Sequence, residues 1–243
     1  YLYFMTKKTL NQNGKYVHKF KDFIEPDYIF SNKPINRFKI FDDKNYKAKL
    51  NKSYQLSDLK DKINTIENCN LKINSNKLIM GEGKINSPLM LIGETPGKIE
   101  DDTGKAFQGE IGSLLKKMLL AININIDEVY LTYSINFRTP DDRKPTAQEI
   151  RRYSIFLKQH ISIINPQMII LMGSTAMEAV TGSNEKISNE RGKWKEIILE
   201  NKTIPIIITY SPSFLIKFPE YKKYSWEDLK KIKKKLQDLN INI

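Results

Sequence analysis

Residues 89–112, with the sequence LMLIGETPGKIEDDTGKAFQGEIG, join a short apolar run to a long polar loop that is rich in glycine. The apolar run at residues 89–92 lies between Pro88 and Gly93, which is typical of a buried β-strand. An apolar helical pattern begins at residue 111. A strand and a helix are usually joined by about 2–6 residues, whereas about twenty separate them here. This length favours a functional loop over an ordinary connection with solvated acids.

The loop carries side chains that suit a bound ligand. Its glycines allow the backbone to approach a ligand closely. Its carboxylates, among them Glu94 and Glu100, can act as a base or position a water molecule, and Phe107 is its one aromatic residue. In open α/β sheets, the loops that leave the carboxyl ends of parallel strands form the ligand site. The sequence therefore predicts a binding or catalytic site at this loop.

Strand-like and helical patterns alternate along the rest of the chain. The apolar runs lie at residues 89–92, 129–132, 168–172 and 204–209. The helical patterns lie at residues 111–122, 146–164, 174–180 and 226–239. Strands that alternate with helices predict an α/β fold with a parallel sheet covered on both faces. Thr146 and Glu149 form a capping-box signature for the second helix, which should end at Asn165-Pro166.

The composition limits the class of protein. The 243 residues are 40% hydrophobic, which is enough for a core, and the net charge of +12 favours an anionic partner such as nucleic acid. The charge also fits a chain made rich in Lys, Asn and Ile by biased codon usage, so both interpretations stay open. No apolar run is long enough to cross a membrane, and the first residues lack a signal-peptide pattern. We expect a soluble cytoplasmic protein with no membrane partner.

Few residue types that bind metals are present. Cys69 is the only cysteine, which excludes a disulfide framework and a cysteine-based metal cluster within one chain. The two histidines, His18 and His160, are far apart in the sequence. Neither GxxxxGK[ST] nor GxGxxG occurs, so nucleotide hydrolysis and dinucleotide binding lack support.

Residues 1–60 differ from the remainder of the chain. They contain 13 Lys and Arg against 6 Asp and Glu, and they show no long periodic run. We expect a partly ordered basic extension with a short helix near residues 56–66, for which Ser57 is the candidate N-cap. The extension is either a nucleic-acid-binding arm or a solvated tail. We place the domain boundary so that residues 1–68 form the extension and residues 69–243 form the folded domain.

Three further loops should reach the same edge of the sheet, because each follows a predicted strand. They cover residues 133–145, 173–176 and 210–217. Their basic side chains can neutralise phosphates, and helix N-termini add backbone donors. The basic candidates are Arg138, Arg143, Lys144 and Lys217.

Aromatic residues in these loops allow two interpretations. They either stack on bases or pack in the core, and they are Phe107, Tyr133, Phe137 and Phe214. Residues 191–194, RGKW, are likewise either a DNA contact or a hairpin whose tryptophan packs on the sheet.

The loops and their spacing resemble the family 4 uracil-DNA glycosylases of the uracil-DNA glycosylase superfamily. The family motif GEaPGxxED…GxpFxGxxGxLL is similar to residues 93–115, and RPPxxRxPtxxEI to residues 138–150. The motif P-kiivxlGxxA is similar to residues 166–176, RGxW to residues 191–194, and HPsyLLRxPxxK…WxDL to residues 210–229. The resemblance covers residues 71–236 in the same order and spacing.

The resemblance implies a three-layer α/β/α sandwich with a central four-stranded parallel sheet. It also implies an enzyme that flips uracil out of DNA and hydrolyses its N-glycosidic bond. Phe107 would stack on the flipped uracil, and Glu94 or Glu100 would position water and stabilise the oxocarbenium-like sugar. The residues implied in substrate binding are Gly93, Thr95, Gly97, Phe107 and Tyr133. Those implied in DNA binding are Arg138, Arg143, Arg191, Ser213 and Lys217.

Two departures from the family concern the reaction. Ser211 aligns with the family's histidine, which supports the uracil O2 as charge develops. Tyr133 aligns with its asparagine, which contacts the uracil edge. Because a serine hydroxyl can still donate to O2, Ser211 joins Glu94 and Glu100 as a catalytic candidate. The two replacements predict attenuated or altered specificity.

A third departure concerns the family's iron–sulfur cluster. Cys69 is the one cysteine left at the four ligand positions, and Ile66, Phe137 and Tyr153 align with the others. We therefore expect no iron–sulfur cluster and no other cofactor, with hydrophobic residues in the place of the cluster.

These observations lead to one expected function and two alternatives. We expect a monomeric, metal-free uracil-DNA glycosylase of base excision repair, whose partner is DNA that contains uracil or another damaged base. The alternatives are a catalytically inactive DNA-binding relative and a glycosylase for another deaminated base.

Overall fold

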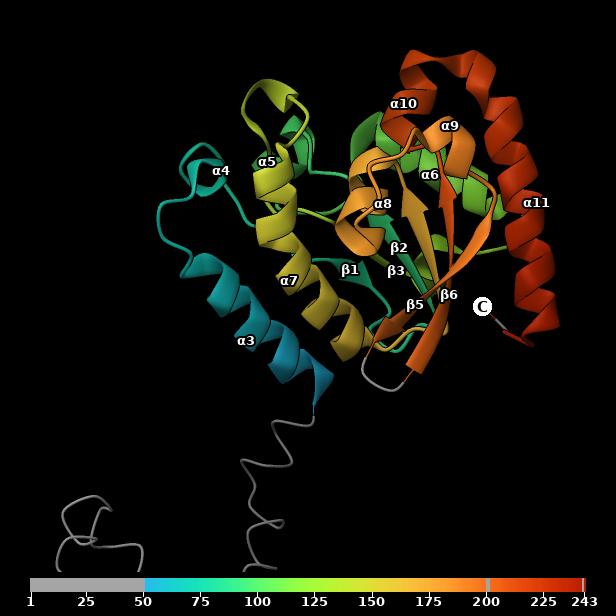
Figure 1. The fold of residues 1–243 in the computed structure, drawn as a ribbon, viewed down its shortest axis with the longest axis horizontal. Coiled ribbons are helices and arrows are strands. Elements are labelled where there is room, and N and C mark those ends of the chain that lie inside the picture. Colours follow the sequence, from blue (N-terminus) through green and yellow to red (C-terminus); the bar gives the residue numbers. More distant parts are fainter. Residues whose placement is uncertain (1–50, 200–201, 242) are drawn as a thin grey trace, which may run out of the picture. The chain divides into compact units, whose positions relative to one another are not determined.

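The four predicted apolar runs form the centre of a six-stranded sheet in the computed structural model (Figure 1). The strand order is β1-β3-β2-β4-β6-β5, in which β3, β2, β4 and β6 are parallel and the two edge strands are antiparallel. The strands are β1 Glu82–Gly83, β2 Leu89–Gly93, β3 Tyr130–Tyr133, β4 Met168–Met172, β5 Trp194–Leu199 and β6 Lys202–Thr209. The expected four-stranded parallel sheet is thus correct for the centre, but the whole sheet is mixed and has six strands.

The structure describes residues 51–199, 202–241 and 243. The partly ordered basic extension that the sequence predicts lies, for residues 1–50, outside this described part. Residues 51–68 include a helix, α3 Lys52–Asn64, whose Leu59 and Ile63 are buried in the core. The domain boundary after residue 68 stays a prediction.

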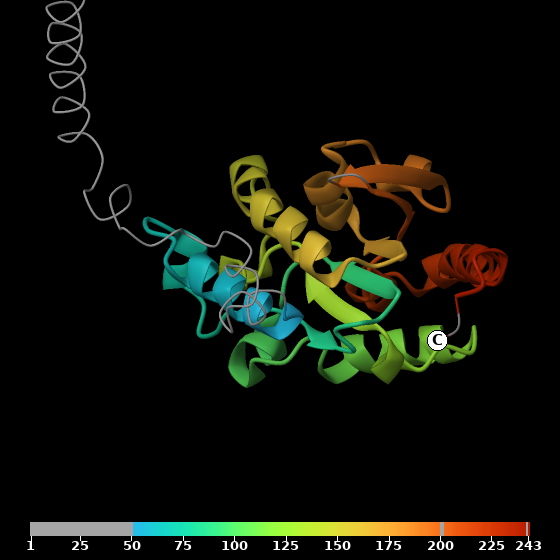
Figure 2. The same ribbon diagram turned by 90° about the horizontal axis from the view of Figure 1, so that it is seen from below.

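The central strands separate two apolar cores, because successive side chains of a strand point to opposite faces. Met90 and Ile92 of β2 belong to one core, and Leu89 and Leu91 belong to the other. Helices α3, α7 Ala147–Ile164 and α8 Ser174–Thr181 contribute to the first core. Helices α6 Gly109–Leu120 and α11 Lys222–Asp238 contribute to the second. Figure 2 shows α7 (yellow) and α6 (green) on opposite sides of the sheet.

The helix boundaries follow the capping chemistry of the sequence. Thr146 accepts from the Glu149 N–H at 3.2 Å, and the Glu149 carboxylate accepts from the Thr146 N–H at 2.7 Å, which confirms the predicted start of α7. The predicted start of the short helix near residues 56–66 was wrong. Asn51, not Ser57, is the N-cap of α3, because its side chain accepts from the Ser53 N–H at 2.9 Å.

Short helices complete the connections. The α-helices are α4 Asn70–Ile73, α5 Lys98–Thr103, α9 Ile187–Glu190 and α10 Pro212–Lys217. The 3₁₀ turns are η3 Ile126–Glu128, η4 Pro140–Asp142 and η5 Pro219–Tyr221. Helix α5 divides the long loop that follows β2. Among the described residues, no helix is long and apolar enough to cross a membrane.

The edge strand β5 bears out the hairpin interpretation of residues 191–194 for Trp194. Trp194 begins β5 and pairs with Ile207 of β6, and its half-buried ring packs against the second core. The RGKW sequence is therefore the start of a β5–β6 hairpin whose tryptophan packs on the sheet.

Candidate active site

The loops that follow β2, β3, β4 and β6 meet at one edge of the sheet. Gly93 at the end of β2 pairs with Tyr133 at the end of β3. On the other side, the Gly173 N–H after β4 donates to the carbonyl of Thr209 in β6 at 2.9 Å. In Figure 1 this edge of the sheet faces α10. The predicted loops are therefore brought together as the parallel topology requires.

Glu94 reaches across this edge to the start of α8. Its Oε1 accepts from the Thr175 N–H at 3.1 Å and from the Ser174 hydroxyl at 3.3 Å. Gly173 makes room for it: a Cβ at Gly173, where φ is +107°, would lie 2.3 Å from the Glu94 Cδ. The amides at a helix N-terminus stabilise negative charge. The half-buried Glu94 carboxylate is thus held in one orientation at the end of the sheet.

Glu100 closes the loop that carries Phe107. Only 2% of Glu100 is exposed, and its two carboxylate oxygens accept from backbone amides at either end of the loop. The Gly97 N–H donates to Oε2 at 3.1 Å, and the Gln108 N–H donates to Oε1 at 2.9 Å. Glu100 therefore shapes the loop, whereas Glu94 lies at the end of the strand.

Phe107 and Tyr133 form a stacked pair. Their ring centroids lie 4.6 Å apart with an interplanar angle of 18°, and the Phe107 N–H donates to the Tyr133 hydroxyl oxygen at 3.0 Å. Phe107 has a positive φ of 50°, which a non-glycine residue rarely adopts. Burial raises the pKa of Tyr133, and the negative charge of Glu100 adds to this effect. The phenol is therefore neutral at physiological pH.

Ser211 lies at the opposite side of the site, as the N-cap of α10. Its Oγ accepts from the Phe214 N–H at 3.4 Å and lies 3.0 Å from the Ser213 Oγ. The ring of Tyr210 stacks on Phe214 with centroids 4.9 Å apart. Ser211 is buried and Ser213 is half-buried, so both hydroxyls are held by local structure.

The three predicted arginines are each paired with a carboxylate. Arg138 donates to both oxygens of Asp142, at 2.7 and 2.9 Å. Arg143 donates to both oxygens of Glu149, at 2.9 and 2.7 Å.

Arg191 is paired with Asp228, whose side chain has no exposed surface. Asp228 also accepts from the Thr209 hydroxyl at 2.9 Å, and Arg191 donates to the carbonyl of Tyr224. These contacts join the β5–β6 hairpin to α11, so Arg191 has a structural role that the sequence did not reveal. The one sequence feature that could have pointed to this pair is the W-E-D-L sequence of the family motif, which contains Asp228.

Lys217 is exposed at the end of α10. The hydrogen bond from Arg138 lowers the pKa of Asp142, and the charges of Lys217 and Lys98 act in the same direction. The amino groups of Lys217 and Lys98 thus lie near the Arg138–Asp142 pair, and together they give this edge a basic rim. Thr95 and Gly97 lie beside it, between β2 and α5.

The four positions aligned with iron–sulfur ligands lie in the first core. The Cys69 Sγ is 3.2 Å from the Tyr153 hydroxyl, and the rings of Phe137 and Tyr153 meet edge to face with centroids 6.2 Å apart. Ile66 packs against the same core. One thiol cannot provide the four thiolates that such a cluster needs. The residues present therefore do not fit an iron–sulfur cluster. No group of three or more His, Cys, Asp and Glu in the described part is arranged to hold a metal ion.

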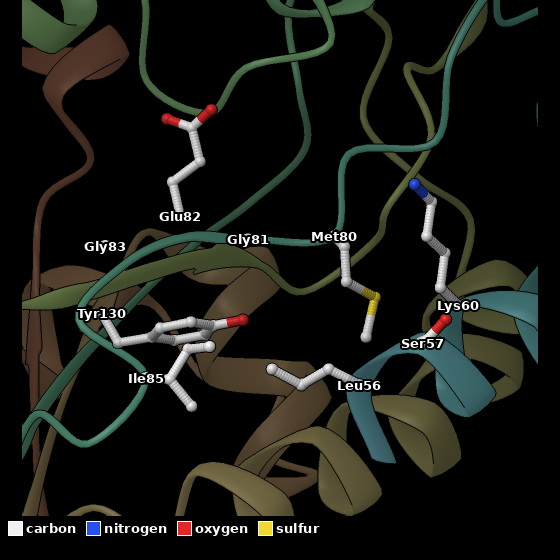
Figure 3. Close-up of a pocket in the computed structure, with 9 residues that line it drawn as sticks. All are labelled: Leu56, Ser57, Lys60, Met80, Gly81, Glu82, Gly83, Ile85 and Tyr130. Carbon is white, nitrogen blue, oxygen red and sulfur yellow. The ribbon is translucent and has the colours of Figure 1, made fainter. Parts of the chain in front are cut away.

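A pocket of about 590 Å³ lies elsewhere, between α3 and the β1 edge of the sheet (Figure 3). Its apolar walls are Leu56, Met80, Ile85 and Tyr130. β1 pairs with the start of β3, whereas the candidate active site begins at Tyr133, where β3 ends. The pocket is therefore separate from the candidate active site.

Comparisons with known proteins agree with this architecture. The model of the Uracil DNA glycosylase superfamily matches residues 80–230. A type-4 uracil-DNA glycosylase from Thermotoga maritima is 34% identical over 168 residues, which cover 68% of this chain and 86% of that protein. Another from Sulfurisphaera tokodaii is 32% identical over 186 residues, or 73% of this chain and 83% of that protein. A DNA polymerase of Bacillus phage SP01 is 31% identical over 154 residues, which are 63% of this chain and 16% of the polymerase.

Proposed function

The chain belongs to the uracil-DNA glycosylase superfamily, and we propose that it hydrolyses the N-glycosidic bond of uracil in DNA, in base excision repair. The observation that carries the proposal is the extent of the family match, since residues 80–230 include every loop at the carboxyl edge of the sheet. The proposed partner is DNA that contains uracil or another damaged base. We further propose a monomer in the cytoplasm, since one chain supplies the whole site and a single buried thiol suits a reducing compartment.

Glu94 is the proposed catalytic carboxylate. Cleavage of the glycosidic bond gives the sugar oxocarbenium character, which a nearby carboxylate stabilises while it orients the attacking water. Glu94 is half-buried at the end of β2, and its Oε1 is held by the start of α8. Both oxygens of Glu100 accept from backbone amides, so we assign Glu100 to positioning Phe107.

Ser211 is the proposed donor to the leaving uracil. Its hydroxyl is neutral, and the family's histidine is absent from this position. Loss of one preorganised donor lowers a rate by about 10²–10³-fold, which predicts slow excision. Substrate contacts are proposed for the backbone of Gly93, Thr95 and Gly97.

Phosphate contacts are proposed for Ser213 and Lys217, with Arg138 nearby on the same rim. Arg143 and Arg191 can add to the positive field, although carboxylates already pair with both. The basic rim is expected to hold the DNA backbone beside the flipped nucleotide.

The test is a uracil-excision assay. Single-stranded DNA with one uracil and an end label is incubated with the protein, and alkali then cleaves any abasic site. We expect a shortened product whose rate of formation falls about 10²-fold or more in Glu94→Gln, because the charge that stabilises the cation is lost. Glu128→Gln, in an exposed turn remote from the site, is the matched control and should keep the wild-type rate.

The outcomes separate the alternatives. Equal rates for wild type and Glu94→Gln would remove Glu94 from the reaction. If uracil gives no product, the same assay with hypoxanthine or xanthine identifies a glycosylase for another deaminated base. No product from any of these bases, together with intact DNA binding, would reject the glycosylase and leave an inactive DNA-binding relative.

A further inference from the structure

The stacked pair of Phe107 and Tyr133 closes the place where a flipped base would lie. Only 6% of Phe107 and 4% of Tyr133 is exposed, so neither face of the Phe107 ring is open to a base. A Cβ at Gly93 would lie 2.8 Å from the Phe107 Cζ and 2.9 Å from the Tyr133 Cδ1. The two rings therefore fill the space above the end of β2.

Tyr133 also reproduces the chemistry of a base in that place. A flipped uracil would offer a flat ring to Phe107 and a carbonyl oxygen to a backbone N–H of the loop. The phenol offers a flat ring at 18° to Phe107 and a hydroxyl oxygen that accepts from the Phe107 N–H at 3.0 Å. The Tyr133 side chain thus takes up both the stacking face of Phe107 and the Phe107 N–H donor.

The surrounding contacts indicate which of the two rings can move. Phe107 lies in a loop that Glu100 holds through two backbone amides. Tyr133 is the last residue of β3, and its hydroxyl accepts from the Phe107 N–H and lies within hydrogen-bonding reach of the Glu100 carboxylate. Rotation of the Tyr133 side chain breaks one stack and these two contacts of its hydroxyl, whereas displacing Phe107 also breaks the backbone hydrogen bonds that hold the loop.

We propose that Tyr133 is a gate that occupies the base site and must turn out before a damaged base can enter. The proposal rests on the proposed function in that it takes the face of Phe107 as the base site. A nucleotide that carries a base has to displace Tyr133, whereas an abasic nucleotide does not. Tyr133 therefore favours DNA at an abasic site over DNA with a uracil, and it limits which bases are admitted.

The experiment compares two oligonucleotides that differ at one nucleotide. One carries 2′-fluoro-2′-deoxyuridine, whose glycosidic bond resists hydrolysis, and the other carries a tetrahydrofuran abasic analogue. The measured quantity is the ratio of the dissociation constants for the fluorouridine DNA and the abasic DNA. We expect the wild-type ratio to exceed one. Tyr133→Ala, which removes the ring without adding a contact to the base, should lower the ratio about tenfold, the value of a stack and a hydrogen bond together.

A second variant covers the case in which Tyr133→Ala does not fold. Tyr133→Phe keeps the ring and removes the hydroxyl, so it should lower the ratio in the same direction by a smaller factor. Tyr130→Phe is the matched control. It also removes a buried hydroxyl from β3, but that hydroxyl bonds His160 and lies away from Phe107, so this variant should keep the wild-type ratio.

The results distinguish this inference from the proposed function. A wild-type ratio that neither Tyr133 variant changes overturns the gate, even if the protein excises uracil. A ratio that falls in the Tyr133 variants supports the gate, even if no variant forms an excision product. In that case the glycosylase function fails while the base site and its gate remain.

Discussion

Asp228 has no exposed surface, and the Arg191 guanidinium supplies its counter-charge. Arg191→Ala would leave this carboxylate buried and unpaired, next to the Thr209 hydroxyl. Removing one partner of a buried pair costs about 3–5 kcal/mol of unfolding free energy. We expect a loss of that size in urea denaturation. Arg143→Ala is the control, because its exposed pair with Glu149 should add little to stability. If Arg191→Ala lowers DNA affinity and leaves the urea midpoint unchanged, Arg191 serves DNA binding instead.

His160 makes stability depend on pH. It is buried in α7 with a 2.8 Å hydrogen bond to the Tyr130 hydroxyl, and burial lowers its pKa to about 3. In the unfolded chain its pKa is about 6.5, so the unfolded state binds one more proton between these values. The free energy of unfolding therefore falls as the pH falls through this window. The loss is about 2–3 kcal/mol between pH 6.5 and 4.5.

His160→Gln tests this assignment by urea denaturation at several pH values. The glutamine keeps a polar partner for Tyr130 but cannot titrate. The variant should be less stable than wild type at pH 7, and its deficit should shrink by about 2–3 kcal/mol at pH 4.5. A deficit that is constant with pH would mean that His160 does not titrate in this window.

Helix α8 begins and ends at a glycine with positive φ, so substitutions at Gly173 and Gly182 can be compared directly. Gly173 at its start has a φ of +107°, and a Cβ there would collide with Glu94. Gly182 at its end has a φ of +72°, and a Cβ added there would have no atom of the described residues within 4 Å. Gly173→Ala should displace the Glu94 carboxylate and lower excision about 10²-fold or more. Gly182→Ala should keep excision and cost about 1–2 kcal/mol of stability through backbone strain. Equal excision by both variants would show that the position of Glu94 does not matter.

The central strands and long helices could be predicted because buried elements carry continuous local signals. The apolar runs at residues 89–92 and 168–172 lie in β2 and β4, and the capping box at Thr146 marks α7. The edge strands carry weaker signals. β1 was missed, and β5 was anticipated only as the hairpin alternative for residues 191–194. β1 has two residues, and Trp194–Leu199 has one exposed side and no uniform apolar run.

The site was predicted less completely than the fold. The loop after β2 and its acids could be found from composition and from the family motifs. The contacts that distinguish Glu94 from Glu100 could not, because their partners, Thr175 and Gln108, are known only from the folded chain. The pairing of Arg191 with Asp228 spans 37 residues and leaves no periodic signal.

For the molecule as a whole, the basic residues near the N-terminus allow two roles, a nucleic-acid-binding arm or a solvated tail, and the dependence of DNA affinity on salt distinguishes them. Residues 1–50 contain 11 of the 40 Lys and Arg and 5 of the 28 Asp and Glu. If they form an arm that binds phosphates, deleting them should weaken DNA binding about tenfold at low salt and flatten the dependence of affinity on salt. Fluorescence anisotropy with labelled DNA over a range of salt concentrations measures both quantities. An unchanged salt slope would identify residues 1–50 as a solvated tail.

Glu100 affects how the loop between Gly97 and Gln108 opens locally. Because one carboxylate holds the amides of Gly97 and Gln108, an opening that frees one of them frees the other, so both should exchange their hydrogens in a single cooperative event. The segment between them would then open as one cooperative unit, with both hydrogen bonds to Glu100 either formed or broken. During base entry the Tyr133 side chain at the end of β3 would move, while the loop that carries Phe107 keeps its position.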